Sequence, residues 1–203
     1  MIRAVVFDWG GVFTNGTFDS SAVRNLAKLF CVTEEKIAST YFPLMAEFEI
    51  GSFDMKNFHR LFSEHSSLES DVGIFKKTFL SSVIDRPEMF KVLNGIPDTY
   101  LLGMLSNNVP VLCDQVRDDP RLSRISRRNF VFSNEIGVRK PDPLAFTHLI
   151  DVLGVLPEEV AFIDDNDINI SACNNIGFTG IHIPNYETFR VNWDVALPEV
   201  LIT

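Results

Sequence analysis

The pattern of apolar positions divides the chain into stretches of two kinds. Residues 2–7 are a short apolar run rich in β-branched side chains, which predicts a buried strand of a parallel sheet. From about Asp19 to Phe90 the apolar residues recur every three or four positions, the spacing of amphipathic helices. No convincing strand interrupts this block, and the spacing predicts four helical segments over 21–30, 33–48, 54–65 and 69–83.

Residues that favour helix N-termini stand near the expected starts of these segments. They are Ser20, Thr33, Asp54, and Glu69 with Ser70. Pro43 lies inside the second segment, and we expect it to end or kink that helix because proline has no amide proton to donate.

The second half of the chain alternates strands with helices. The pattern predicts four strands (99–107, 129–134, 160–165 and 179–183) and three helices (109–118, 143–154 and 168–177). Such alternation is typical of an α/β fold, here a Rossmann-like, doubly wound parallel sheet. The first strand belongs to this sheet, so the helical block is an inserted α-helical cap. We expect an α/β core of residues 1–15 and 91–203 and a cap of residues 16–90.

Composition narrows the classes of partner. The 203 residues carry a net charge of -9, which argues against a nucleic-acid or anionic-membrane partner. The three cysteines have no metal-like spacing and are expected to be reduced thiols. No apolar run approaches membrane-spanning length, and the first residues read as a strand, so a cytoplasmic protein is expected.

Polar residues stand where the predicted strands end. Asp8 follows the first strand and precedes a glycine pair, Ser106 and Asn107 end the second, and Asp164 and Asp165 end the fourth. Because ligands of open α/β sheets bind at the carboxyl ends of the strands, these side chains are expected to share one site. Lys140, just before a predicted helix, is expected to join them.

These residue types suit phosphoryl transfer. Asp8 and Asp165 offer the hard oxygen ligands that Mg²⁺ prefers, and the cation allows a carboxylate to approach an anion. A free oxygen of Asp8 can then attack phosphorus and form an aspartyl-phosphate. Ser106, Lys140 and the backbone amides of the glycine turn are expected to bind the phosphate oxygens.

Four motifs in order resemble the haloacid dehalogenase superfamily of phosphohydrolases: "VVFDWGGV", "MLSNN", "GVRKPDP" and "FIDDNDIN". The helical insert resembles the small helical cap of that family. The resemblance implies the following roles: Asp8 as nucleophile, Ser106 as phosphate-binding hydroxyl, Lys140 as charge stabiliser, Asp165 and the Gly10 carbonyl as metal ligands, Asp164 as a ligand directly or through water, and Asn169 as an indirect support of the metal. Trp9, Gly10 and Asn107 join Ser106 and Lys140 as substrate-binding residues, with packing as the alternative for Trp9.

Position 10 departs from the family pattern. Most family phosphatases carry there a second aspartate that serves as general acid and then base, whereas this chain has Gly10. The segment "SNEIGVRKPDP" resembles a subgroup with α-D-glucose-1-phosphate phosphatases, which also has this glycine. We therefore expect a small phosphorylated metabolite as substrate, with a sugar 1-phosphate as the candidate, and a preference for good leaving groups.

Two alternatives remain open from the sequence. A 2-haloacid dehalogenase uses the same nucleophile without a metal, against which the Asp164–Asp165 pair argues. A non-catalytic descendant that binds a partner through its cap is the second. Glu47 and Glu49 in "EFEIGSF" could face sugar hydroxyls, but an exposed loop is the favoured interpretation of this turn.

Overall fold

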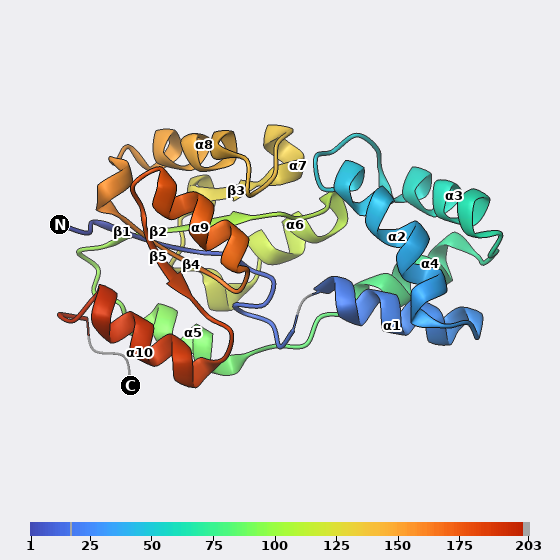
Figure 1. The fold of residues 1–203 in the computed structure, drawn as a ribbon, viewed down its shortest axis with the longest axis horizontal. Coiled ribbons are helices and arrows are strands. Elements are labelled where there is room, and N and C mark those ends of the chain that lie inside the picture. The colour runs from blue at the N-terminus through green and yellow to red at the C-terminus, as the bar shows by residue number, and fades with distance from the viewer. Residues whose placement is uncertain (17, 201–203) are drawn as a thin grey trace.

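The computed structural model describes residues 1–16 and 18–200. Residue 17, in the predicted cap range, and residues 201–203, in the predicted core range, lie outside the described part. The ribbon has two lobes, a sheet with helices on both faces and a group of helices beside it (Figure 1).

A five-stranded sheet forms the centre of the larger lobe, with strand order β3-β2-β1-β4-β5 and every neighbouring pair parallel. Its strands are β1 (Ala4–Phe7), β2 (Leu101–Ser106), β3 (Phe130–Phe132), β4 (Val160–Asp164) and β5 (Thr179–His182). The first strand is the central one, so the predicted doubly wound parallel sheet is confirmed. The chain adds β2 and β3 on one side of β1 and later adds β4 and β5 on the other side. The carboxyl ends of β1, β2 and β4 therefore lie side by side.

Helices cover both faces of this sheet (Figure 1). Alternate residues of β1 point to opposite faces, because Ala4 and Val6 pack in one apolar cluster and Val5 and Phe7 in the other. The first face is covered by α8 (Pro143–Leu153) and α9 (Asp167–Asn175), and the second by α5 (Pro87–Gly95) and α10 (Tyr186–Ala196). The remaining short elements of this lobe are α6 (Pro110–Arg117), α7 (Ser133–Ile136) and 3₁₀ turns over Pro120–Leu122, Arg127–Asn129 and Pro157–Glu159.

The smaller lobe consists of the four helices that follow β1. They are α1 (Phe18–Phe30), α2 (Glu34–Phe48), α3 (Met55–Ser66) and α4 (Val72–Leu80). Their apolar stripes meet in a cluster of fully buried phenylalanines, in which the rings of Phe48 and Phe58 lie 4.8 Å apart and those of Phe62 and Phe75 lie 5.2 Å apart. Many of the 18 phenylalanines therefore serve this packing rather than the site.

Two helix starts agree with the sequence and two differ. Helix α1 begins at Phe18, so Ser20 lies within its first turn and does not precede it. The side chains of Thr33 and Asp54 accept hydrogen bonds from the amides of the first turns of α2 and α3, as predicted. The fourth helix begins after Asp71, whose carboxylate accepts from the Gly73 and Ile74 amides, and not at residues 69–70.

Pro43 does not end its helix, because α2 continues to Phe48. The proline lies at an exposed position, where water can solvate the carbonyl that lacks its amide partner. Burial of Tyr41, Leu44 and Met45 on either side stabilises the continued helix.

The end of the third strand and two helices differ from the prediction. The third strand ends at Phe132, because Ser133–Ile136 closes a helical turn on Gly137, and the prediction of a strand to residue 134 was wrong. Helices α5 and α10 were not predicted. Pro87 is pre-set for a first helical turn, so α5 spans residues 87–95, and the expected core–cap boundary at 90/91 falls inside it.

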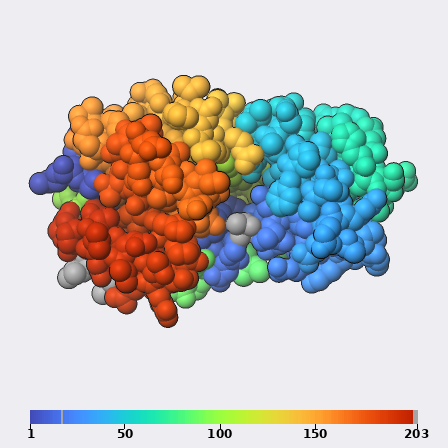
Figure 2. All heavy atoms as spheres, viewed as in Figure 1, coloured from blue at the N-terminus to red at the C-terminus, as the bar shows by residue number. Residues whose placement is uncertain are grey.

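Two chain segments join the lobes and pair with each other. The Asn15 amide donates to the Ile84 carbonyl at 2.7 Å, and the Arg86 amide donates to the Phe13 carbonyl at 2.8 Å. The end of α2 also rests on the core, where cyan and yellow spheres meet at the upper edge of the molecule (Figure 2). None of the helices in the described part combines the length and apolarity needed to cross a bilayer.

Candidate active site

Asp8 extends the central strand by one residue and turns its side chain to the carboxyl edge of the sheet. Its amide still donates to the Ile163 carbonyl of β4 at 2.8 Å, which fixes the backbone. The Trp9 amide donates to Asp8 Oδ1 at 2.7 Å and leaves Oδ2 to face the site. Burial raises the pKa of Asp8 to about 7, although Lys140 acts to lower it. A buried carboxylate of this kind needs compensating positive charge.

Lys140 supplies part of that charge. Its buried ammonium lies 3.0 Å from Asp8 Oδ2 and 2.6 Å from Asp164 Oδ2. Burial acts to lower the pKa of Lys140, but the carboxylates of Asp164 and Asp8 raise it above its ordinary value, so the side chain stays charged. The position of Lys140 is set by Asn107, whose side-chain amide donates to the Lys140 carbonyl at 2.9 Å and accepts from its amide at 2.8 Å.

The Asp164 carboxylate is fully buried and surrounded by donors. Its Oδ1 accepts from the Asn166 amide at 2.8 Å, and its Oδ2 from Lys140 at 2.6 Å. Asn169 Nδ2 lies within hydrogen-bond distance of both oxygens, at 3.1 and 3.0 Å. With these contacts Asp164 has little capacity left for a further ligand and acts to hold Lys140 in place.

Asp165 is the more open member of the acidic pair. It lines the pocket, and burial followed by the charge of Asp164 raises its pKa. Gly11 makes room for it: Gly11 has φ +70°, and a Cβ there would stand 2.0 Å from Asp165 Oδ2. The Gly11 amide donates to Thr14 Oγ1 at 2.9 Å, so this amide stabilises the turn and is not free for a phosphate oxygen.

The acidic residues form a group suited to a divalent cation. One carboxylate oxygen from each of Asp8, Asp164 and Asp165 lies within 4.8 Å of the others. Lys140 pairs with Asp8 and Asp164, and the charge of Arg86 acts on Asp165. Three carboxylates therefore exceed the two cations near them, so the cluster carries excess negative charge in a largely buried place. Oxygen ligands of this kind match the preference of Mg²⁺, and a bound cation would relieve the charge. The donor set therefore fits the metal that the sequence predicts.

Ser106 adds an unpaired donor next to this cluster. The residue is 1% exposed and ends β2. Its hydroxyl acts on the Asp8 carboxyl, whose pKa it lowers, but it makes no hydrogen bond of ordinary geometry among the described residues. A buried hydroxyl without a partner is costly, which is typical of a group kept for a ligand. The structure thus brings Ser106, Lys140 and the three aspartates to one edge of the sheet.

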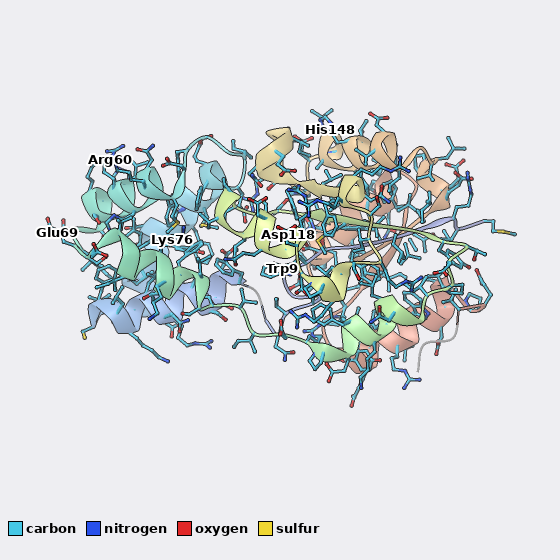
Figure 3. The ribbon with its side chains drawn as sticks, turned by 180° about the vertical axis from the view of Figure 1, so that it is seen from behind. Trp9, Arg60, Glu69, Lys76, Asp118 and His148 are labelled. Carbon is cyan, nitrogen blue, oxygen red and sulfur yellow. The ribbon has the colours of Figure 1, made fainter. Side chains whose placement is uncertain are left out.

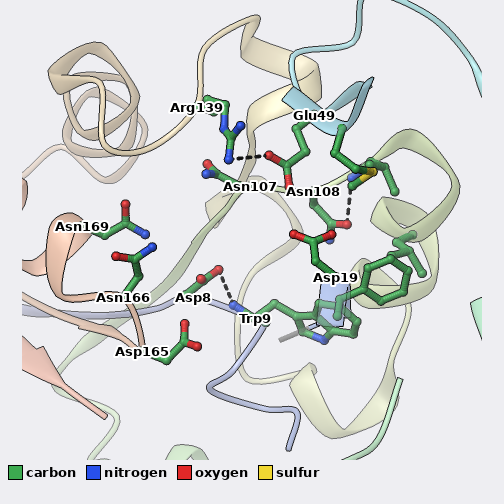
Figure 4. Close-up of a pocket in the computed structure, with 15 residues that line it drawn as sticks. Asp8, Trp9, Asp19, Glu49, Asn107, Asn108, Arg139, Asp165, Asn166 and Asn169 are labelled. Atoms are coloured by element: carbon green, nitrogen blue, oxygen red, sulfur yellow. Dashed lines mark hydrogen bonds and ion pairs between the residues drawn. The ribbon is translucent and has the colours of Figure 1, made fainter. Parts of the chain in front are cut away.

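A pocket opens above these residues between the two lobes (Figure 4). From the core it is lined by Asp8, Trp9, Gly10, Asn107, Asn108, Val109, Leu112, Arg139, Asp165, Asn166 and Asn169, and from the helical lobe by Phe18, Asp19, Met45 and Glu49. Trp9 lies where the lobes meet, whereas Arg60, Glu69 and Lys76 project from the outer surface of the helical lobe (Figure 3).

Glu49 corrects one expectation from the sequence. The favoured interpretation of its turn was an exposed loop, but Glu49 is buried, lines the pocket and forms a 2.9 Å ion pair with Arg139 Nη2. Glu47, two residues earlier, is exposed as expected and accepts a hydrogen bond from Ser52. The reason is the helix period: Glu49 follows Met45 by four residues, so both side chains lie on the side of α2 that lines the pocket.

Sequence reasoning missed four polar lining residues, Asp19, Asn108, Arg139 and Asn166. Asp19 accepts a hydrogen bond from the Tyr41 hydroxyl at 2.8 Å, and burial raises its pKa. The signal for Arg139 was its place beside Lys140 in the third motif. For Asp19 the sequence carries no signal beyond its position at the start of the helical block.

Comparisons with known proteins agree with this geometry. A family model described as haloacid dehalogenase-like hydrolase matches residues 2–177. A relative named D-ribitol-5-phosphate phosphatase, from Bacteroides thetaiotaomicron, is 25% identical over 97% of this chain and 99% of its own.

Two solved structures share the fold. A HAD-like family hydrolase from Porphyromonas gingivalis has a TM-score of 0.78 and 24% identity, covering 98% of this chain and 97% of its own. A HAD family enzyme from Bacteroides thetaiotaomicron, solved with magnesium and inorganic phosphate, has a TM-score of 0.73 and 20% identity over 90% and 94%. Since the family model spans most of the sequence, this chain belongs to the haloacid dehalogenase-like hydrolases.

Proposed function

We propose that this hydrolase is a Mg²⁺-dependent phosphomonoesterase that transfers the phosphoryl group of a small metabolite to Asp8. The observation that carries the proposal is the arrangement around Asp8. A buried carboxylate with one oxygen facing a pocket lies 3.0 Å from the Lys140 ammonium and beside two further aspartates. An anionic phosphate can approach such a carboxylate only where positive charge is concentrated.

The metal would be held by the side chains of Asp8 and Asp165 and by the backbone carbonyl of Gly10. When bound, Mg²⁺ supplies charge neutralisation between the phosphate and the attacking carboxylate. Asp164, whose oxygens already face several donors, orients Lys140 and contributes to the metal only indirectly. Asn169 supports the same carboxylate from α9.

The side chains have separate roles in attack, phosphate binding and positioning. Asp8 Oδ2 attacks phosphorus and displaces the leaving-group oxygen, and water later attacks the phosphorus of the resulting aspartyl-phosphate. Lys140 and the Ser106 hydroxyl bind the phosphate oxygens, on which negative charge lies throughout the transfer. Asn107 acts as a positioning residue, because both ends of its amide are taken up by the Lys140 backbone. Trp9 forms part of the pocket wall.

The helical segment within residues 16–90 acts as a cap that closes the pocket and contacts the organic part of the substrate. Asp19 and Glu49 from this segment, with Arg139 from the core, give the pocket a polar lining suited to hydroxyl groups. The relative from Bacteroides thetaiotaomicron is named for a sugar-alcohol phosphate, and the solved structure with magnesium and phosphate comes from the same fold. The name of the relative supports a polyhydroxylated phosphate ester as substrate, and the magnesium and phosphate in the solved structure support a metal-dependent phosphate site.

A sugar 1-phosphate remains our candidate within that class. An anomeric oxygen leaves more readily than an ordinary alcohol, and position 10 lacks the aspartate that usually protonates the leaving group. The name of the relative points instead to a phosphate on a primary alcohol, so 5- and 6-phosphates belong in the same test.

The experiment is a panel of phosphate monoesters assayed for phosphate release with Mg²⁺ and with excess EDTA. We expect release that requires the metal, highest on sugar or sugar-alcohol phosphates. Assaying 2-chloropropionate for chloride release separates the dehalogenase alternative, which needs no metal. Halide release without phosphate release would overturn the proposal, and the absence of both would favour a non-catalytic binding protein.

A further inference from the structure

Nothing in the packing requires glycine at position 10, the position at which most family phosphatases carry the general acid. A Cβ placed on Gly10 meets no atom of the described residues within 4 Å, and its φ lies outside the left-handed region that demands glycine. By contrast, Gly11 next to it cannot accept a Cβ. The site therefore has open space where the acid would stand, and that space belongs to the pocket that Gly10 lines.

Glu49 reaches the same pocket from the helical lobe. It is 6% exposed, lies at the C-terminal end of α2 and lines the pocket together with Asp8 and Gly10. Its carboxylate and that of Asp8 are both drawn at the pocket wall in Figure 4, with Arg139 paired to Glu49. In-line displacement puts the leaving-group oxygen on the side of the phosphorus away from Asp8. The helical lobe lies across the pocket from the sheet edge that carries Asp8, so Glu49 stands on that side.

The core holds Glu49 in this place. The Ser133 hydroxyl donates to the Glu49 carbonyl at 2.5 Å and accepts from the Asn108 amide at 3.0 Å. Gly51, with φ +76°, packs so closely that a Cβ there would stand 2.5 Å from the Asn134 carbonyl. These contacts fix the end of α2 against α7, so the Glu49 carboxyl has a defined position relative to the sheet.

We propose that Glu49 is the general acid and base of this enzyme, in place of the aspartate missing at position 10. The inference rests on the proposed phosphatase function. As Asp8 Oδ2 bonds to phosphorus, the bond from phosphorus to the leaving-group oxygen breaks, and that oxygen takes the proton of the Glu49 carboxyl. The Glu49 carboxylate then takes a proton from the water that attacks phosphorus. The bond to Asp8 breaks, and phosphate and the free carboxylate of Asp8 are released.

The charges around Glu49 allow both protonation states near neutral pH. Burial raises the pKa of Glu49 to about 7, against the opposing charge of Arg139. Asp19 and Asp8 raise the pKa further, and Lys140 lowers it. A group that must give and then take a proton works best with a pKa near the working pH. Burial raises the pKa of the rival carboxyl, Asp19, as well, but its Oδ1 is already engaged by the Tyr41 hydroxyl at 2.8 Å.

Substituted phenyl phosphates test this role, because they vary the leaving-group pKa and carry no sugar hydroxyls. We expect Glu49→Gln to retain near wild-type kcat/KM on the ester of the most acidic phenol. The loss should grow to about 100-fold or more as the phenol becomes less acidic, the scale of general acid catalysis. Activity on the first ester shows that the variant is folded. Glu47→Gln, in the exposed neighbour, should leave the whole series unchanged.

A double substitution gives a second test of the role of Glu49. Because position 10 has room for a side chain, Gly10→Asp in the Glu49→Gln background should restore part of the lost rate on poor leaving groups. Parallel leaving-group plots for wild type and Glu49→Gln would overturn the assignment, and so would a steeper plot for Asp19→Asn alone. If the wild type releases phosphate from none of these esters, the proposed function itself fails.

Discussion

The Lys140 ammonium lies 3.0 Å from Asp8 Oδ2, inside the protein and at the carboxyl edge of the sheet. This pair joins the end of the first strand to the third motif, 132 residues later in the chain. It places a fixed positive charge beside the oxygen that we propose attacks phosphorus. Because three carboxylates surround Lys140, the negative charge of the site is not neutralised without a further cation. Several predictions depend on this excess of negative charge.

Asp8→Asn should stabilise the metal-free protein in mildly alkaline solution. The folded-state pKa is about 7, whereas an unfolded chain ionises near pH 3.9, so the folded protein holds a proton that the unfolded chain has lost. Stability of the wild type therefore falls as pH rises from about 4 to about 7. Asparagine carries no such penalty.

Thermal melts in EDTA measure this difference. We expect Asp8→Asn to be more stable than wild type by on the order of 2 kcal/mol at about pH 8, a few degrees in Tm. The difference should shrink toward zero near pH 4. Equal melting temperatures at both pH values would show that Asp8 is not held in an unfavourable ionised state.

Mg²⁺ should raise the melting temperature of the wild type, because a ligand that binds only the folded state stabilises it by mass action. Asp165→Asn should lose most of this rise, since Asp165 is the acidic residue of the fourth motif that stays open to the pocket. The control is Asp151→Asn, an exposed residue of α8, which should respond to Mg²⁺ as the wild type does. An undiminished response of Asp165→Asn would remove this residue from the metal site.

Gly11→Ala should destabilise the protein more than Gly154→Ala. Both glycines have positive φ, at +70° and +66°, so alanine costs about 1–2 kcal/mol of backbone strain at each. Only at position 11 would the added Cβ also meet Asp165, at 2.0 Å. Urea unfolding gives both values. We expect a larger loss for Gly11→Ala, together with weaker Mg²⁺ binding, and equal losses would contradict the packing described here.

The choice between sugar 1-phosphates and 6-phosphates should depend on Glu49. With Glu49 present, kcat/KM for a hexose 1-phosphate should exceed that for the matching 6-phosphate only modestly, because a proton is available to either oxygen. In Glu49→Gln the 6-phosphate should lose more, since a primary alcohol is the poorer leaving group. A preference for the 6-phosphate that survives the substitution would show that neither Gly10 nor Glu49 shapes specificity.

The sequence predicted which side chains meet in the core better than it predicted how the helical insert docks against the core. Strand-end residues such as Asp8, Ser106 and Asp165 could be predicted to meet, because parallel strands bring their carboxyl ends to one edge. Most strands and helices followed from local apolar patterns, although their ends did not always do so. Helix α10 was missed, although Phe189 and Trp193 are buried, because apolar residues stand at every second position from Phe189 to Val195, which hides the helical period.

The part of the site that the lobes share could not be predicted in the same way. Whether Glu49 faces solvent or the pocket depends on how the end of α2 rests against Ser133 and Asn134, a contact between segments far apart in the chain. Local sequence carries no information on such docking. The donors to the Asp164 carboxylate are two local residues, Asn166 and Asn169 at the start of α9, and the distant Lys140.

The covalent state of Asp8 during turnover tests the central claim most directly. The protein is mixed with Mg²⁺ and a phosphate ester labelled on phosphorus, and the reaction is quenched in acid within one turnover. The protein is then digested, and the peptide that contains Asp8 is analysed. The account predicts labelled phosphate on Asp8 in the wild type, and neither label nor phosphate release in Asp8→Asn. Phosphate release by a folded Asp8→Asn protein, or turnover of the wild type without label on Asp8, would contradict it.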